Sequence, residues 1–421
     1  MVFLILREIS ISGIISFIST LVFVLSPIHI NAVGWIAGRG DLLAAFFSAA
    51  ALLIYLKFIT KDKAYLLVFV SILLFLAILS KEVSLLVPFL FLGFYFIEKK
   101  MYELNKNSVA AMMMIILVIG SYYLLRGLFL SGVHIDKFSF TTYYRNILVL
   151  PETVSKFFIP VGIRPLAGID SFTSISGTIL LIIISVIPLQ LKLVNKGRYY
   201  FGLAWLVFLL IPGMVFRTMG QDGFYYWDCR SYLPAIGLAI MVSEVLQVIT
   251  SQNHRRFYYS LTAVYLLILG SVTFIEIRLY KSPVTYWKAV RADYPSSFLP
   301  YDALFNYYTF NDNPGKAEAQ LIRAIELRPG VLSIRIKLFN FYVKQNLSVK
   351  AQSLLQKTLI DDRLYSDYLA GRYLDYLFKT DRYDTNEFNK LINAYRDDKK
   401  TLEKINKIAR IKKNESGDSV L

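Results

Sequence analysis

The sequence predicts an all-α protein: a polytopic helical membrane bundle of about nine spans, followed by an α-helical repeat domain. Of the 421 residues, 56% are hydrophobic and 18% are charged. An ordinary soluble domain is roughly 45–50% apolar and about 25% charged. The apolar residues gather in long runs as far as residue 280, and the remainder shows a period of 34 residues. We therefore expect a membrane domain over 1–280 and a separate helical domain after it.

The predicted spans follow from bilayer thickness. A hydrocarbon core about 30 Å thick is crossed by roughly 20 apolar residues at 1.5 Å per residue. The stretch 143–161 holds Arg145, Glu152 and Lys156, so we expect an amphipathic helix there, which lies on the membrane or fills a re-entrant gap. The runs that qualify as spans are 11–28, 41–59, 63–80, 83–97, 107–129, 173–191, 199–216, 232–250 and 258–279.

Basic residues in the short loops set the orientation of such a bundle. A cytoplasmic N-terminus places the dense basic clusters in the cytoplasmic loops: Arg7; Lys57, Lys61 and Lys63; Lys99, Lys100 and Lys106; Lys192, Lys196 and Arg198; Arg255 and Arg256. We therefore expect a multi-pass integral membrane protein with residues 281–421 outside the cytoplasm. The low cysteine content is typical of a bacterial protein, which predicts the inner membrane and a periplasmic C-terminal domain.

The C-terminal part carries an internal repeat. The segment from Lys316 to Pro329 resembles the second helix of a tetratricopeptide repeat, a helix–turn–helix unit of 34 residues. Such units stack into a concave surface. We expect this domain over 281–398, with a basic tail over 399–421. The matches at an offset of 34 are Asn306/Asn340, Tyr308/Tyr342, Lys316/Lys350, Ala317/Ala351, Leu321/Leu355 and Ile325/Leu359.

Composition also excludes some functions. The formal net charge is +16, yet nucleic-acid binding would need a soluble basic face with interleaved aromatic residues, and none is visible. The one cysteine, Cys229, excludes a disulfide framework and a cysteine-based metal cluster. No metal-ligating residues are predicted.

A charged side chain in an apolar span costs about 2.5–3.5 kcal/mol at mid-membrane, so charged residues in or beside such spans suggest a functional site. We expect the charged groups of three such clusters, together with His29, to meet in one cavity on the outer side. The clusters are Ser26-Pro-Ile-His29-Ile-Asn-Ala-Val-Gly-Trp35-Ile-Ala-Gly-Arg39-Gly-Asp41-Leu-Leu, Leu79-Ser80-Lys81-Glu82-Val-Ser-Leu-Leu-Val-Pro88 and Asp228-Cys-Arg230-Ser-Tyr232-Leu-Pro234-Ala-Ile-Gly237.

In their order, these clusters resemble the motifs of the polytopic C-type glycosyltransferases that carry tetratricopeptide repeats. These include the transmembrane and tetratricopeptide-repeat O-mannosyltransferases and their bacterial relatives. The resemblance implies transfer of a sugar from a polyprenyl-phosphate carrier, at the outer face of the membrane, to a protein or glycan acceptor that docks on the repeats. No cofactor follows from it with certainty, and a divalent cation is left open.

Residue roles follow from the matched motifs. Asp41 and Glu82 are the candidate catalytic carboxylates, because an inverting transfer needs a base for the acceptor hydroxyl. Cationic side chains at the membrane surface suit the lipid phosphate. The residues that the resemblance implies for binding the lipid phosphate and sugar are His29, Arg39, Lys81, Arg230 and Tyr232.

The chain departs from the family pattern in its N-terminal part. Ser26 stands where the family has histidine, and Asn31 where it has an acid. Met1 opens into what resembles the third span of the family, so the first outer loop, with the main catalytic acid, has no counterpart. We expect an N-terminally incomplete or degenerate relative, or one part of a split enzyme, that binds the carrier better than it turns it over.

Structural interpretations compete with these roles. Arg39 with Asp41, Lys81 with Glu82, and Arg230 with Asp228 are each adjacent enough in sequence to form a structural ion pair, and His29 suits a hydrogen-bonded loop position. The rival function is a non-catalytic, membrane-anchored repeat scaffold that recruits partners outside the cytoplasm through residues 299–380. A transporter would show inverted repeats or helices broken at mid-membrane, and neither is visible in the sequence.

Overall fold

The computed structural model divides the chain into two compact units, Met1–Lys281 and Ser282–Leu421. The residues that it describes are 1–61, 63–99, 106–129, 146–166, 168–215, 228–250, 255–347, 349–351, 353–354, 402–403 and 406–407. These residues form helices and turns, with no strand among them. The all-α class is therefore confirmed for the described part of the chain.

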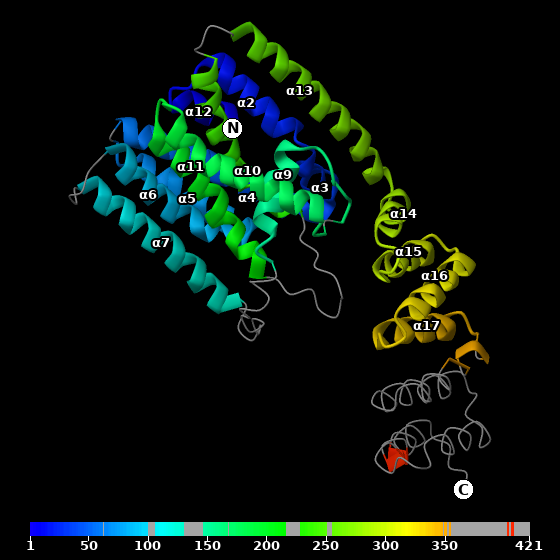
Figure 1. Ribbon diagram of the computed structural model, residues 1–421. Helices are drawn as coiled ribbons and strands as arrows, with labels where there is room; N and C mark the ends of the chain where they lie inside the picture. The colour runs from blue at the N-terminus through cyan, green and yellow to red at the C-terminus, as the bar shows by residue number, and fades with distance from the viewer. Residues whose placement is uncertain are drawn as a thin grey trace. The chain divides into compact units, whose positions relative to one another are not determined.

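The first unit is a bundle of α-helices joined by short 3₁₀-helices (Figure 1). A described helix overlaps each of the nine apolar runs. The elements are α1 Val2–Glu8, α2 Gly13–Leu25, η1 Pro27–His29, α3 Ile30–Gly34, η2 Ile36–Gly38, α4 Arg39–Lys61, α5 Leu66–Ser80, η3 Glu82–Leu86, α6 Val87–Lys99, α7 Lys106–Phe129, α9 Val149–Phe158, α10 Ser171–Gln190, α11 Lys196–Leu210, η4 Ile211–Val215, η5 Asp228–Ser231, α12 Ala235–Ile249, α13 Arg255–Glu276 and η6 Ile277–Lys281.

Among the described residues, five helices are long and apolar enough to cross a membrane, or six if the bent pair Gly13–Leu25 and Pro27–Gly34 forms one span. The chain thus has the helices of a multi-pass membrane protein. Two further apolar helices, Leu66–Ser80 and Ala235–Ile249, are shorter, because Lys81 ends the first and Pro234 begins the second. The count of nine spans stays a prediction.

Helix α13 shows how such a segment meets lipid. Only 6% of its apolar window is buried, and Leu267 and Phe274 are 71% and 63% exposed. Large apolar side chains left uncovered along a whole helix would be a liability in water. In a bilayer they face hydrocarbon.

The bend between α2 and α3 is satisfied by side chains from distant elements. Pro27 cannot continue the backbone ladder of α2, and the axis turns by 50° there. The hydroxyl of Thr273 donates to the freed Leu25 carbonyl at 2.7 Å, and Ser26 donates to the Phe157 carbonyl at 3.2 Å. The backbone groups freed at such a bend need partners of this kind wherever lipid surrounds the helix, because lipid offers none.

Helix α9, at the centre of the predicted amphipathic stretch, is packed inside the bundle. Most of its residues are buried, the charged Glu152 and Lys156 included. Its close neighbour is α10, where a Cβ added at Gly177 would collide with the Pro151 carbonyl. The helix therefore fills a gap in the bundle and does not lie on its surface.

The predicted cytoplasmic ends of three helices meet at one end of the unit. Arg198, in the first turn of α11, pairs with Glu98 near the end of α6 at 2.9 Å. The carboxylate of Glu244 in α12 accepts from the Asn195 backbone at 3.3 Å. If the helices cross the membrane in alternating directions, these ends of α6, α11 and α12 lie on the same side, as the contacts require.

Helices α11 and α12 approach each other through two glycines. A Cβ at Gly237 would collide with the Gly202 carbonyl, and one at Gly202 would lie 2.7 Å from the Gly237 carbonyl. We predict that Gly237→Ala destabilises the protein by about 1–3 kcal/mol, the usual cost of overpacking. Chemical unfolding in detergent micelles measures the loss.

The matched control for this variant is Gly120→Ala in α7, where an added Cβ meets nothing within 4 Å. This change should be neutral or stabilise by about 0.5–1 kcal/mol, because alanine loses less backbone entropy than glycine in a helix. If the two substitutions change the free energy of unfolding equally, the contact between α11 and α12 tolerates an added methyl group, contrary to the prediction.

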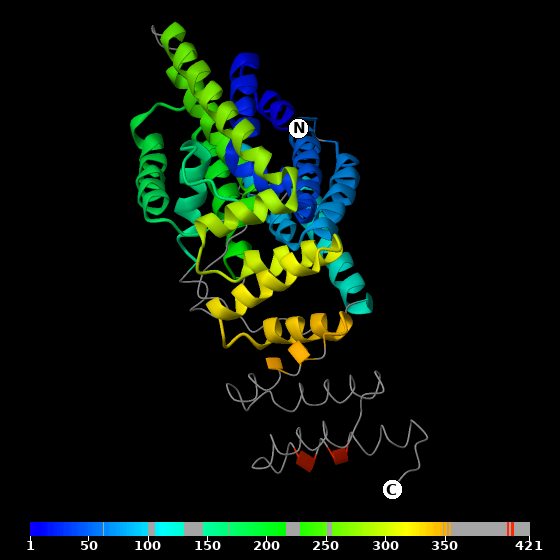
Figure 2. The ribbon, with the colours of Figure 1, turned by 90° about the vertical axis from the view of Figure 1, so that its right-hand side faces the viewer.

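The second unit begins with four helices, α14 Pro283–Asp293, α15 Leu299–Phe310, α16 Pro314–Leu327 and α17 Leu332–Lys344, which follow one another side by side (Figure 2). Positions 34 residues apart share the same environment: Leu304 and Leu338 are both buried, as are Ala317 and Ala351. This agreement supports a helical repeat. Its identity as a tetratricopeptide repeat stays a prediction.

Ion pairs connect segments of the second unit that are not consecutive in the chain. Lys337 in α17 reaches Asp302 in α15 at 2.6 Å, and Lys350 reaches Glu318 in α16 at 2.6 Å. Leu355 and Leu359 of the predicted repeat lie outside the described residues, as does the predicted basic tail apart from 402–403 and 406–407.

Candidate functional site

The first feature of the site is an ion pair between two of the predicted clusters. Asp41 lies in the first turn of α4, where a helix N-terminus favours a carboxylate. Lys81 follows the last residue of α5 in an extended conformation. Its Nζ lies 2.9 Å from Asp41 Oδ2. The side chain of Asp41 is 5% exposed and that of Lys81 is 33% exposed, so the lysine keeps an open side for a ligand.

The 3₁₀-helix η5 brings the third cluster to this pair. The Cys229 thiol is buried, and Asp41, Lys81 and Arg230 all act on it electrostatically. Burial, with the nearby Asp41 carboxylate, raises the pKa of the thiol to about 12, so it is uncharged at neutral pH. Arg230 also donates to the Gly213 carbonyl at 3.4 Å. We refer to Asp41, Lys81, Cys229 and Arg230 as the cationic cluster.

Glu82 and Arg39 lie apart from this pair. The Glu82 side chain is 67% exposed and lies 4.0 Å from Arg126 in the last turn of α7. Arg126 also donates to the Tyr122 hydroxyl at 2.8 Å. Sequence reasoning missed Arg126, although it stands near the outer end of the run 107–129. The Arg39 side chain is exposed and makes no ion pair or hydrogen bond with other described residues.

His29 is enclosed by aromatic rings. Its ring centroid lies 4.6 Å from those of Phe23 and Tyr232, and 6.2 Å from that of Phe157. The side chain is buried, and neither ring nitrogen has a hydrogen-bond partner among the described residues. His29 is thus hydrogen-bonded through its backbone N–H, which donates to the Ser26 carbonyl at 3.2 Å, while its ring contacts Tyr232 and not a charged group.

A buried triad was not predicted. Lys156 Nζ lies 3.4 Å from Glu152 and 3.5 Å from Asp228, with all three side chains at most 6% exposed. Glu152 also accepts 2.7 Å hydrogen bonds from Thr173 and Ser174 at the start of α10. The triad thus ties η5 to α9 and α10. Its sequence signal was weak, because Asp228 stands 72 residues from Lys156.

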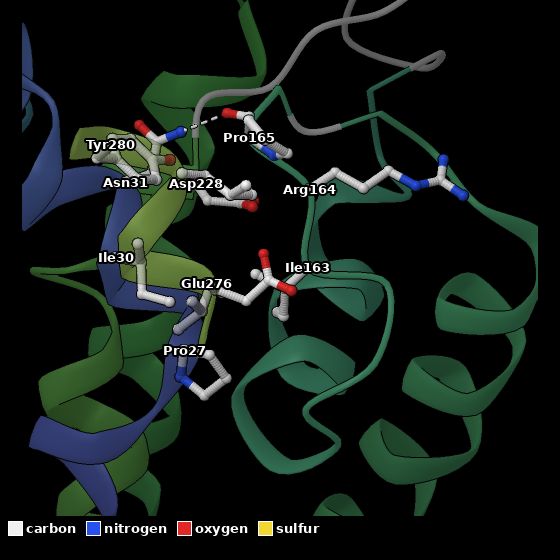
Figure 3. A pocket seen from close by; sticks show the side chains of 11 residues that line it. Pro27, Ile30, Asn31, Ile163, Arg164, Pro165, Asp228, Glu276 and Tyr280 are labelled. Carbon is white, nitrogen blue, oxygen red and sulfur yellow. Dashed lines mark hydrogen bonds between the residues drawn. The ribbon is translucent and has the colours of Figure 1, made fainter. Parts of the chain in front are cut away.

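A pocket opens on the other side of η5 (Figure 3). It lies between η1, α3, the segment 163–165, Asp228 and the end of α13 with η6. Its volume is about 10 Å³, roughly the room that one water molecule needs. Asn31 at its edge donates to the Pro165 carbonyl at 2.9 Å. Glu276, which the sequence analysis did not select, carries a carboxylate into the pocket.

The predicted site residues therefore divide into groups. Asp41 and Lys81 are in contact, and Cys229, the residue before Arg230, lies near enough to both for their charges to act on its thiol. Glu82 pairs with Arg126, His29 with aromatic rings, and Arg39 with none of the described residues. No group of three or more His, Cys, Asp or Glu side chains is placed to hold a metal ion within the part of the chain that the structure describes.

No protein-family model matches the sequence, and neither a curated protein nor a solved structure shows significant similarity to it. The function must therefore be argued from the residues. Chemically, the cationic cluster offers an ammonium and a guanidinium at the end of apolar helices, an arrangement suited to a phosphate oxygen held at a membrane surface.

Proposed function

We propose that this chain is an integral membrane glycosyltransferase-like protein that takes its sugar from a polyprenyl-phosphate carrier at the extracytoplasmic face. The observation that supports the proposal most directly is the cationic cluster. Lys81 lies at the break between two apolar helices, and one third of its side chain remains exposed. A lipid phosphate, whose chain stays in the bilayer, would meet this ammonium group at the surface.

The cluster suggests different roles for the two candidate carboxylates. Asp41 is buried and 2.9 Å from Lys81, so we infer that it positions the lysine. Glu82 is 67% exposed beside Arg126, which leaves its carboxylate accessible to an acceptor hydroxyl. A general base must lie within hydrogen-bond reach of the proton that it removes, and accessibility favours Glu82 for this step.

The helical repeat of the second unit would serve the acceptor, a protein or glycan held outside the cytoplasm. In the proposed topology, the basic loops face the cytoplasm and the second unit faces the periplasm of a bacterial inner membrane. A reporter fused after Gly330 should then be active outside the cytoplasm, and one fused after Lys61 inside it. Activity in the cytoplasm of the reporter fused after Gly330 would contradict the proposed topology.

The decisive experiment measures ligand binding and transfer with the full chain in lipid nanodiscs. Polyprenyl phosphate should bind, and polyprenol of the same length should not, because only the phosphate meets the cationic cluster. Transfer of radiolabelled hexose from polyprenyl-phosphate hexose to added peptide or glycan acceptors then tests catalysis. Equal affinity for the two lipids, without transfer, would overturn the proposal and favour the non-catalytic scaffold.

A further inference from the structure

A carboxyl group is enclosed near the C-terminal end of α12. Glu244 is fully buried, and its Oε2 atom accepts a hydrogen bond from the Asn195 backbone at 3.3 Å. Its Oε1 atom is buried as well and has no hydrogen-bond partner among the described residues. Burial strongly disfavours an ionised carboxyl group unless both oxygens find donors or a cation. One oxygen of Glu244 therefore lacks what a carboxylate needs.

A second buried acceptor stands on the same face of α12. Gln247 follows Glu244 by three residues, so the two side chains are neighbours on the helix surface. The Gln247 Oε1 atom also has no hydrogen-bond partner among the described residues. A proton on Glu244 Oε1 would satisfy both atoms, because the resulting O–H group donates to Gln247 while Oε2 still accepts from Asn195.

The charges around Glu244 favour a proton over a metal ion. Arg198 and Glu98 are the charged side chains that act on it electrostatically, and they pair with each other at 2.9 Å. Asn195 bridges the two acids, because its side-chain amide donates to Glu98 at 3.4 Å. An ionised Glu244 would add an uncompensated negative charge beside Glu98. A metal ion at this place would be repelled by the Arg198 guanidinium.

The helices packed against α12 offer no other charge to this carboxyl group within the described part of the chain. Helix α2 carries no titratable side chain. Helix α1 carries Arg7, which donates to the Ile11 carbonyl, and Glu8. Helix α11 adds Lys196, which is exposed, and Tyr199, whose hydroxyl donates to the Ile184 carbonyl at 2.7 Å. Neither basic side chain is among the charges that act on Glu244.

We propose that Glu244 is a proton-binding site that holds α12 against the start of α11 and releases its proton as the pH rises. The neutral acid satisfies Gln247 and Asn195, whereas the anion leaves two acceptors bare beside Glu98. In the unfolded chain a glutamate titrates at about pH 4.3, so the folded state binds the additional proton. This contribution to stability is therefore present in acid and lost as the pH rises through the titration of Glu244. In the proposed topology, the site responds to the pH of the cytoplasm.

Infrared spectroscopy tests the proton directly, with the full chain in a detergent that contains no carbonyl group. A protonated carboxyl group has a C=O stretching band that a carboxylate lacks. Wild type should show a band at neutral pH that Glu244→Gln removes, and the difference spectrum separates Glu244 from other acids. The matched control is Glu326→Gln, an exposed carboxylate of the second unit, which should keep the band. If Glu244→Gln leaves the spectrum unchanged, Glu244 is ionised and the proposal is overturned.

Glu98→Gln alters the same site without changing Glu244. Arg198 then loses its paired anion, and its charge acts on Glu244 alone. An opposite charge nearby lowers the pH at which a carboxyl group titrates, so the midpoint of the Glu244 band should fall by about 1–3 pH units. A midpoint that stays in place would contradict the charge argument on which the proposal rests.

Amide hydrogen exchange from Asn195 to Tyr199 measures the effect on the fold. Glu244→Gln should fold and keep this segment protected, because its amide mimics the neutral acid: the nitrogen donates to Gln247 and the oxygen accepts from Asn195. Above the midpoint, the ratio of the wild-type exchange rate to that of the variant should rise by up to about tenfold per pH unit, as release of one proton predicts. A ratio that does not depend on pH, or a variant that fails to fold, would overturn the proposal.

Discussion

Replacing Lys156 by methionine should destabilise the first unit by about 3–5 kcal/mol, the usual cost of removing one partner of a buried ion pair. Lys156 is the cation between Glu152 and Asp228, and its side chain is 3% exposed. Methionine keeps the length of the side chain but leaves two carboxylates in a poorly solvated site. Burial already raises the pKa of Asp228, and the Lys156 charge opposes that shift.

The loss should therefore depend on pH in a stated direction. Without Lys156, the pKa of Asp228 in the folded protein lies still further above its value in the unfolded chain. A carboxyl group with a raised pKa destabilises the fold increasingly as the pH rises through that range. The difference between wild type and Lys156→Met should accordingly be larger at neutral pH than in acid, where a protonated Asp228 needs no cation.

Cys229 reports this unfolding without an introduced cysteine, because it is the one cysteine of the chain and is buried. Its alkylation rate in a denaturant series gives the free energy of unfolding. Lys192→Met, at an exposed position, is the matched control and should change stability by less than about 0.5 kcal/mol. The neutral triple variant Lys156→Met, Glu152→Gln, Asp228→Asn should recover most of the loss; a triple variant as unstable as the single one would show that packing, not charge, is responsible.

The helices could be predicted from the sequence because lipid and water impose a simple pattern on it. Long apolar runs bounded by basic residues mark α4, α7, α10, α11 and α13, and these are also the helices of spanning length. The prediction was less precise where a polar break interrupts an apolar run. Lys81 shortens α5 and Pro234 delays the start of α12, so the distinction between full spans and shorter helices depends on packing that the pattern does not contain.

The ion pairs could not be predicted, and the reason is the same in each case. Sequence proximity suggested Asp41 with Arg39, Glu82 with Lys81, and Asp228 with Arg230. In the structure these acids pair instead with cations of other elements. Neighbouring residues on a helix do not face each other, whereas antiparallel helices bring distant residues together at one end. The observed pairs are Asp41 with Lys81, Glu82 with Arg126, and Asp228 with Lys156.

Lys81 pairs with the buried Asp41 and keeps one third of its side chain exposed, so its ammonium group can bind a ligand. Lys81→Ala should weaken binding of polyprenyl phosphate by about 10- to 150-fold, which corresponds to the 1.5–3 kcal/mol typical of hydrogen bonds to charged groups. Lys61→Ala, an exposed lysine at the predicted cytoplasmic end of α4, serves as the control. It should leave the affinity unchanged, because it lies at the opposite end of that helix.

Asp41 decides how this effect arises. If the carboxylate positions Lys81, then Asp41→Asn should weaken carrier binding by a smaller factor, and the double variant Asp41→Asn, Lys81→Ala should bind no worse than Lys81→Ala alone. When two residues act through the same contact, the effects of their substitutions on affinity do not add in such a cycle. The double variant also removes the unpaired buried carboxylate that Lys81→Ala leaves, which separates lost binding from lost stability.

A catalytic Asp41 would give the opposite pattern. Asp41→Asn would then leave carrier affinity unchanged and lower the rate of transfer by about 10²–10⁴, the usual contribution of a positioned general base. Glu82→Gln would in that case have little effect. We expect the reverse, because Asp41 is 5% exposed and bound to Lys81, whereas Glu82 is 67% exposed. Burial and partners, not the order of residues in a motif, determine which carboxylate can reach a substrate proton.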